Sequence, residues 1–141
     1  MKIKYLAAIT MIIAILGTTN AQTEYDQIAS TLTDYIEGTA NGIPDRVTKA
    51  FHPDLNLYSV AGDSLRVWNG KDYIGGIKEG RKSNRVGKII SIDYTKDAAS
   101  AKVEIVIPNR GIFTDYFLLL KYQGTWKVIH KIYTSEDFPD K

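Results

Sequence analysis

Two apolar runs near the C-terminus constrain the fold most strongly. They cover residues 113–122 and 125–133, and a Gln-Gly pair joins them. A two-residue link between apolar segments of high β propensity is typical of a β-hairpin. If the hairpin pivots on this pair, Phe117 lies opposite His130. Both faces of such a hairpin are largely apolar, so helices should cover one face, and a second subunit is the natural cover for the other.

This register assigns each side chain of the hairpin to one of two faces. The face expected to point inward carries Phe113, Asp115, Phe117, Leu119, Trp126, Val128, His130 and Ile132. The face expected to point outward, and predicted to form a homodimer, carries Tyr116, Leu118, Leu120, Ile129, Lys131 and Tyr133. One small domain has few helices to spare, so we expect them on the inward face.

Residues 1–21 have the composition of a secretory signal peptide. Lys2 and Lys4 precede a short apolar stretch, and small residues lead up to a predicted cleavage site after Ala21. The apolar stretch is short for a membrane span, although an uncleaved N-terminal anchor is the alternative. We therefore expect a periplasmic or secreted protein, with one domain over residues 22–141 and no membrane contact after cleavage.

Charge and cysteine content exclude several classes of protein. The signal holds two of the 18 basic side chains and none of the 16 acidic ones, so the mature chain carries 16 of each. A general nucleic-acid binder needs a basic excess, so no nucleic-acid partner is expected. The chain has no cysteine, which excludes disulfides, a thiol nucleophile and cysteine-ligated zinc.

Periodicity and turn residues predict helices first and mostly strands afterwards. A capping pattern begins at Thr23, and Pro44 suits the first turn of a second helix. Pairing Tyr94 with Ala99 across a tight turn would put Ile90 on a buried face. The predicted elements are a helix from residue 23 to about 38–42, a short helix from 44, strands at 55–60 and 65–68, a helix capped by Asn69, and strands at 88–95 and 99–108.

This order of elements resembles the nuclear transport factor 2-like superfamily. The segments KAFHPDLNL (49–57), AASAKVEI (98–105) and GIFTDYFLLLKYQGTWKVIHKIY (111–133) are similar to blocks of its branch labelled "putative lumazine-binding". The resemblance extends over residues 23–134. It implies an α+β fold in which N-terminal helices pack on a strongly curved antiparallel sheet, forming a cone with an internal pocket. It also implies frequent dimers through the outer sheet face, and the superfamily includes both enzymes and pocket proteins without a known reaction.

Asp115 and His130 are the candidate catalytic residues. In the predicted register they lie diagonally across the inward face, within reach of each other. An Asp–His pair in an apolar pocket could act as a general base. The alternative is a buried, hydrogen-bonded pair with a structural role only. The branch that the chain resembles usually has Asn at the position of His130.

Aromatic residues are the candidate ligand contacts. Tyr58, Trp68 and Tyr73 could stack on a flat ligand, or could belong to the core. His52 could be a polar pocket group, a metal ligand with Asp54 and His130, or a helix-end residue favoured by the helix dipole. No metal-site spacing supports the second option, so no metal is predicted. The predicted pocket residues are His52, Tyr58, Trp68, Tyr73, Phe113, Phe117 and Trp126.

A run of basic residues follows the third predicted helix. It could flank the mouth of the pocket and attract an anion. The alternative is a solvated charged surface, which is the usual role of such a run. The run consists of Lys78, Arg81, Lys82, Arg85 and Lys88.

Together these features predict an exported, homodimeric pocket protein that binds a small apolar or aromatic molecule. One alternative is an isomerase or cyclase-type enzyme that uses Asp115 and His130 as an acid–base pair. Another is a protein-interaction module that uses the outer sheet face. No cofactor is expected in any of the three.

Overall fold

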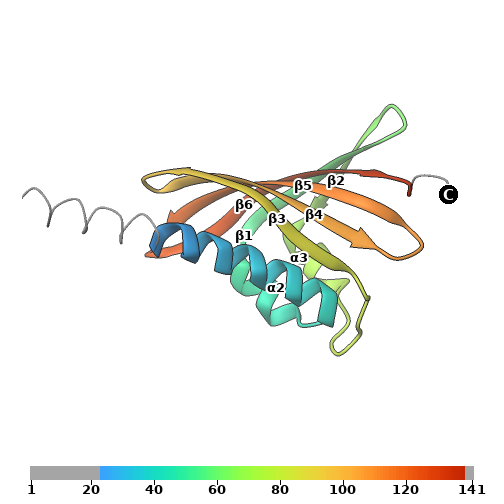
Figure 1. Ribbon diagram of the computed structural model, residues 1–141, viewed down its shortest axis with the longest axis horizontal. Coiled ribbons are helices and arrows are strands. Elements are labelled where there is room, and N and C mark those ends of the chain that lie inside the picture. Colours follow the sequence, from blue (N-terminus) through green and yellow to red (C-terminus); the bar gives the residue numbers. More distant parts are fainter. Residues whose placement is uncertain (1–22, 139–141) are drawn as a thin grey trace, which may run out of the picture.

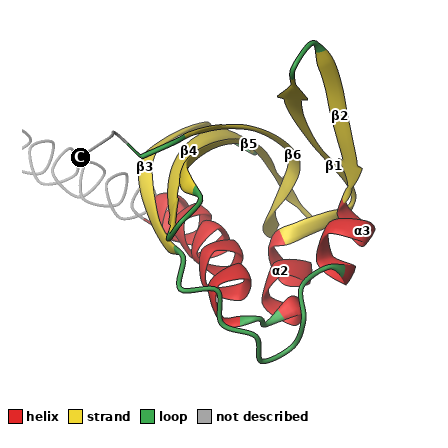
Figure 2. Cartoon of the chain, turned by 90° about the vertical axis from the view of Figure 1, so that its right-hand side faces the viewer, coloured by secondary structure: helices red, strands yellow, loops and turns green. Residues whose placement is uncertain are grey.

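Six strands form one curved sheet, and the helices lie against its concave face (Figures 1 and 2). The computed structural model describes residues 23–138, so the predicted signal peptide lies outside the described residues. The helices are the N-terminal helix (residues 23–41), α2 (Pro44–Ala50) and α3 (Gly70–Gly75). The strands are β1 (Phe51–Ala61), β2 (Ser64–Asn69), β3 (Val86–Thr95), β4 (Ala98–Ile107), β5 (Gly111–Tyr122) and β6 (Thr125–Glu136).

The strand order in the sheet is β2-β1-β6-β5-β4-β3. All neighbours are antiparallel except β1 and β6, which run parallel. The predicted α+β class is confirmed, and the sheet is mixed instead of wholly antiparallel. Most of the chain separates β1 from β6, so no tight turn forces these two strands to oppose each other.

The N-terminal helix supplies much of the core. Ile28, Leu32, Tyr35 and Ile36 recur at the spacing of one helix face, and all four are buried. They form one cluster with apolar side chains of the concave sheet face, including Val103. Figure 1 shows the helix running beneath the sheet. Each aliphatic side chain buried in this way contributes about 1.5–3 kcal/mol to stability.

Charged contacts join the N-terminal helix to α2. Asp34 accepts a hydrogen bond of 2.9 Å from Arg46 Nε, and its other oxygen lies 2.8 Å from Lys49 Nζ. Burial opposes ionisation of Asp34, but hydrogen bonds from the two cations outweigh it and lower the pKa of the carboxyl. The carboxylate therefore stays ionised and holds the two helices together.

Locally encoded features are confirmed. The side chain of Asn69 accepts a hydrogen bond of 2.8 Å from the backbone N–H of Asp72 and caps α3, as predicted. Tyr94 pairs with Ala99 across the predicted turn.

The prediction for Ile90 is wrong, because a register shift between Ile89 and Ser91 turns Ile90 outward, where it is 43% exposed.

The β5–β6 hairpin follows the predicted register only near its turn. Tyr122 pairs with Thr125, and Leu119 still pairs with Val128. Beyond them the register shifts, so that Leu118 pairs with His130 and Ile129 is an extra residue. A bulge of this kind bends the strand and exchanges the faces of every residue that follows it.

This shift overturns part of the predicted face assignment. Lys131 lies opposite Phe117 and is buried, and Tyr133 lies opposite Asp115. His130 takes the outward position opposite Leu118, and Ile132 also turns outward. The pairing of β1 with β6 is irregular in the same region, so the sheet bends there on both sides of β6.

The convex face of the sheet is uncovered within the described residues. Tyr116, Leu118, Leu120 and Ile132 are each between 45% and 55% exposed there. Figure 2 shows the β1–β2 hairpin projecting away from the helices. Between residues 23 and 138, no helix combines the length and apolar character needed to cross a membrane.

Candidate functional site

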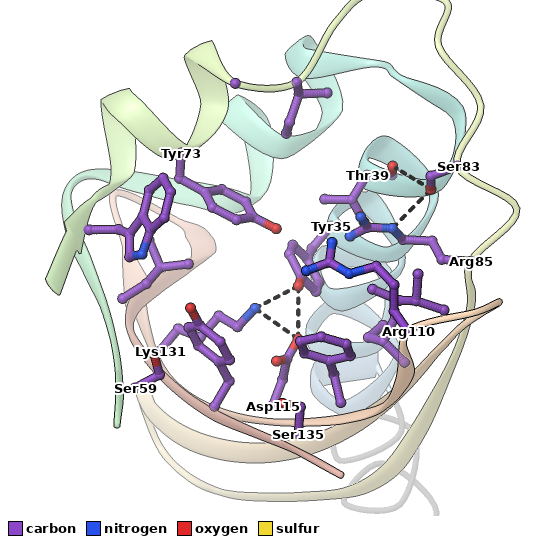
Figure 3. Close-up of a pocket in the computed structure, with 18 of the residues that line it drawn as sticks. Tyr35, Thr39, Ser59, Tyr73, Ser83, Arg85, Arg110, Asp115, Lys131 and Ser135 are labelled. Carbon is purple, nitrogen blue, oxygen red and sulfur yellow. Dashed lines mark hydrogen bonds and ion pairs between the residues drawn. The ribbon is translucent and has the colours of Figure 1, made fainter. Parts of the chain in front are cut away.

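A cavity of about 950 Å³ opens between the concave sheet face, α3 and the loop that follows α3 (Figure 3). Its volume lies in the range of small-molecule sites. The walls combine aromatic side chains with polar and basic ones. Its lining residues come from the N-terminal helix, from β1, β2 and α3, from the loop before β3, and from the strands β4, β5 and β6.

Three side chains meet at the floor of the cavity. Tyr35 Oη donates a hydrogen bond of 2.8 Å to Asp115 Oδ2, and Lys131 Nζ donates one of 2.7 Å to Tyr35 Oη. Lys131 Nζ also lies 2.9 Å from Asp115 Oδ2. Figure 3 shows this closed triangle, which joins the N-terminal helix to β5 and β6.

Burial makes the triangle depend on all three members. Asp115 is 1% exposed and Lys131 is 4% exposed. An ion removed from water to this extent costs several kcal/mol unless it is paired and hydrogen-bonded. Here each ion is the partner of the other, and aromatic rings surround the ammonium, with the Tyr35 and Tyr133 ring centres 4.7 and 5.0 Å from Nζ.

Tyr35 remains a neutral hydrogen-bond donor. Burial raises the pKa of its hydroxyl well above the ordinary value, and the charge of Asp115 and the neighbouring Tyr73 add to the rise. A neutral phenol has one proton to donate. The O–H of Tyr35 donates a hydrogen bond to Asp115, and the oxygen of Tyr35 accepts one from Lys131.

One oxygen of Asp115 takes no part in the triangle. Both contacts of the carboxylate end on Oδ2. Within residues 23–138, Oδ1 has no hydrogen bond, yet no side-chain oxygen or nitrogen there is both buried and unpaired. Oδ1 must therefore retain some contact with open space, and Asp115 is one of the residues that line the cavity.

The structure does not bring the predicted catalytic pair together. Asp115 faces the cavity, whereas the bulge places His130 on the other side of the sheet, where its ring lies 4.9 Å from that of Tyr58. The predicted Asp115–His130 pair is therefore wrong. Lys131, predicted on the outer face, takes the inward place beside Asp115.

The predicted pocket residues fall into two groups. Trp68, Tyr73 and Phe113 line the cavity. The other four lie elsewhere. Phe117 and Trp126 belong to the buried core, Tyr58 contacts His130 on the far side of the sheet, and His52 packs edge-on against Tyr122.

The basic run lies partly at the cavity. Lys78, Arg81, Lys82 and Arg85 are lining residues, while Lys88 points away on β3. In the described part of the chain, no three His, Asp or Glu side chains form a group that could hold a metal ion. His52, Asp54 and His130 thus make no such group there.

Tyr35 and Lys131, two residues of the cavity floor, were not predicted from the sequence. The sequence pattern identifies Tyr35 only as one apolar position of a helix, although its hydroxyl donates the hydrogen bond to Asp115 that joins the helix to the sheet. Lys131 reads as an outward residue because an unbulged strand places it there. The available signal was a charge pair, since a Lys and an Asp both interrupt otherwise apolar strands of one hairpin.

Lys131→Met tests the energetic role of the triangle. The substitution leaves Asp115 buried without its counter-ion, so the free energy of unfolding in urea should fall by about 3–5 kcal/mol. Asp115→Asn should lower the free energy of unfolding much less in the Lys131→Met background than in the unsubstituted protein, because it removes the carboxylate that has lost its counter-ion. Lys102→Met, on the outer side of β4 above the Tyr116 ring, is the matched control and should change stability by less than 1 kcal/mol. Additive effects of the two floor substitutions would contradict the coupling.

Comparisons with known proteins agree with this fold. A family model described as "Putative lumazine-binding" matches residues 23–134. An NTF2-like protein of unknown function from Shewanella baltica is 29% identical, with a TM-score of 0.71 and a match covering 84% of this chain and 96% of that protein. An NTF2-like protein of unknown function from Methylobacillus flagellatus is 28% identical, with a TM-score of 0.71 and coverage of 81% and 93%. The predicted resemblance is thereby confirmed.

The chain is also similar to a protein described as an aldolase. The Aldolase FrzH of Cladobotryum sp is 27% identical over 115 residues, which cover 79% of this chain and 91% of that protein.

Proposed function

The chain belongs to the family described as "Putative lumazine-binding", and we propose that it is an exported protein that binds a small, partly aromatic molecule in the cavity. The observation that carries this proposal is the cavity itself. It has the volume of a ligand site, aromatic side chains in its wall and a small set of convergent polar groups at its floor. Export rests on the signal-like composition of residues 1–21.

The aromatic wall supports a flat ligand. Trp68 and Tyr73 reach the cavity from β2 and α3, and Phe113 reaches it from β5. Rings on several sides of a cavity offer large apolar contact area and few rotatable bonds to freeze. The polar triangle can then orient whatever part of the ligand approaches the floor.

A thermal-shift screen tests this proposal. Flat heterocycles, including lumazine, and steroids should contain compounds that raise the melting temperature, because a bound ligand stabilises the folded state. Trp68→Ala should weaken the shift by removing a stacking surface. Tyr25→Ala is the control, since Tyr25 has the same 44% exposure as Trp68 but lies off the cavity. If no compound shifts melting, and mass spectrometry of protein purified from its native host finds no bound molecule, the proposal fails.

An aldol-type reaction is a second candidate function. It is favoured by the similarity to Aldolase FrzH and by Oδ1 of Asp115, which makes no hydrogen bond within residues 23–138 and belongs to a residue that lines the cavity. A carboxylate in this position could take a proton from a carbon next to a carbonyl group. Lys131 and Tyr35 could then stabilise the negative charge that develops on the carbonyl oxygen.

Deuterium exchange separates catalysis from binding alone. Pyruvate or a cyclic ketone incubated with the protein in D₂O should lose its α-proton NMR signal faster than in buffer if Asp115 acts as a base. Asp115→Asn should abolish the acceleration, while Asp93→Asn, at an exposed position of β3, should not. Exchange that never exceeds the buffer rate, or that survives in a folded Asp115→Asn variant, would exclude this candidate.

We also propose that two copies of the chain associate through the convex sheet face. Exposed apolar side chains gather there at the centre of the sheet, on β5 and β6. The bulge changes the composition of this face, because Lys131 and Tyr133 turn inward and Ile132 turns outward. The proposed contact residues are Tyr116, Leu118, Leu120 and Ile132.

Leu118→Glu should convert the dimer into a monomer, because it places a charge in the middle of the apolar contact. Light scattering at micromolar concentration measures the mass of both forms. Val86→Glu is the control, since Val86 is an exposed apolar residue on the edge strand β3. An unsubstituted protein that is already monomeric would contradict the dimer and favour a different protein as the partner of this face.

A further inference from the structure

We propose that the cavity ligand is an organic anion, in which a carboxylate or phosphate group is bound by Arg85 and Arg110 and an apolar ring lies against the aromatic wall. The inference rests on the proposed binding function and names the chemical class of its ligand. Its basis is the distribution of charge around the cavity.

The cavity wall is far more basic than the protein around it. Residues outside 23–138 hold three of the 18 basic and one of the 16 acidic side chains, so the described residues carry 15 of each. The basic lining residues are Arg66, Lys78, Arg81, Lys82, Arg85, Arg110 and Lys131, against the two carboxylates of Asp72 and Asp115. A concave surface lined by one sign of charge concentrates the field and attracts the opposite ion.

The two lining carboxylates leave most of this charge uncompensated. Asp115 pairs with Lys131, so the floor carries no net charge. Asp72 accepts from Asn69 at the start of α3. Across residues 23–138, none of the six remaining cations lies within ion-pair distance of a carboxylate.

Arg85 and Arg110 are the cations best placed to hold an anion. Figure 3 shows both side chains pointing into the cavity. Arg85 Nε donates a hydrogen bond of 2.9 Å to Ser83 Oγ, and the Arg110 guanidinium lies 5.7 Å from the ring centre of Phe113. Each guanidinium has five N–H donors in a planar fork, so most donors remain available for a bidentate contact with carboxylate or phosphate.

Backbone contacts fix the loop that carries the basic run. The N–H of Gly80 donates to Gly42 O at 2.8 Å, and the N–H of Ser83 donates to Ala40 O at 2.9 Å. Gly42 has φ +64, and a Cβ there would come within 2.5 Å of the loop backbone at Lys78 and Arg81. The loop is thus held against the end of the N-terminal helix by a contact that requires glycine.

The apolar part of the ligand follows from the remaining wall. Tyr73 and Phe113 line the same cavity as the basic residues, and Tyr133 adds a third ring beside Lys131. When the anionic group of a ligand binds the arginines, a ring attached to that group lies in the same cavity and can contact these aromatic side chains. A purely inorganic anion would leave this surface unused, and a purely apolar ligand would desolvate the arginines without replacing their hydrogen bonds.

A matched pair of fluorescent probes tests the inference. 8-Anilinonaphthalene-1-sulfonate carries an anionic group on the same ring system as the neutral N-phenyl-1-naphthylamine. The anionic probe should bind at least about tenfold more tightly than the neutral one, because charge-assisted hydrogen bonds from the arginines are available only to it. Its affinity should also fall as NaCl is raised, whereas that of the neutral probe should not.

Variants locate the bound anion. The double substitution Arg85→Gln/Arg110→Gln should weaken the anionic probe about tenfold or more and leave the neutral probe unchanged. Lys88→Gln is the matched control, because Lys88 belongs to the same basic run but points away from the cavity, and it should alter neither affinity. Circular dichroism checks that each variant is folded.

Each other outcome overturns the inference. Equal affinity for the two probes, or equal effects of the arginine and Lys88 substitutions, would show a cavity without preference for anions and would leave the proposed binding function standing. Loss of the anionic probe on Leu118→Glu, with no effect of the arginine pair, would place it on the convex sheet face. Failure of the anionic probe to bind would also contradict the inference, whereas the binding function fails only if the thermal-shift screen and the search for a co-purified molecule are negative as well.

Discussion

The buried contact among Tyr35, Asp115 and Lys131 is the interaction on which the rest of the structure depends. It joins the N-terminal helix to the two central strands, and it does so with charges that would be costly if any member were absent. The apolar side chains around it could pack in more than one arrangement. A hydrogen-bonded ion pair has few acceptable geometries, so it specifies how the helix sits on the sheet.

The bulge at Ile129 makes this contact possible. In a regular strand that continues the register of the turn, His130 faces the helix and Lys131 faces outward. One extra residue exchanges these positions and brings the ammonium to Asp115. The same irregularity bends β6 where β1 begins to pair with it, so the bulge that brings Lys131 to the floor also contributes to the curvature of the sheet.

Local signals in the sequence predicted the helices, the turns and the capping Asn69, because neighbouring residues determine each of them. The family resemblance added the curved sheet and the pocket. The bulge was not predicted, because Ile129 lies in a run that is apolar on both faces. The hydrophobic pattern is therefore equally consistent with a regular strand and with a strand that has one extra residue. His130 and Lys131 are adjacent polar residues in that run, and only the position of Asp115 on the neighbouring strand decides which of them turns inward. The place of Arg110 at the cavity likewise depends on the way the sheet curves, which no local pattern records.

Charge is arranged differently at the two ends of the cavity, and this separates stability from recognition. At the floor, Lys131 and Asp115 neutralise each other and are bonded to Tyr35, so their charges are largely committed to folding. At the wall, Arg85 and Arg110 lie in a loop and a turn and have no counter-ion among the described residues. Removing a wall cation leaves no buried charge unpaired, whereas removing a floor residue does. The chemical class of the ligand can therefore change through substitutions in the wall while the floor, and with it the fold, is retained.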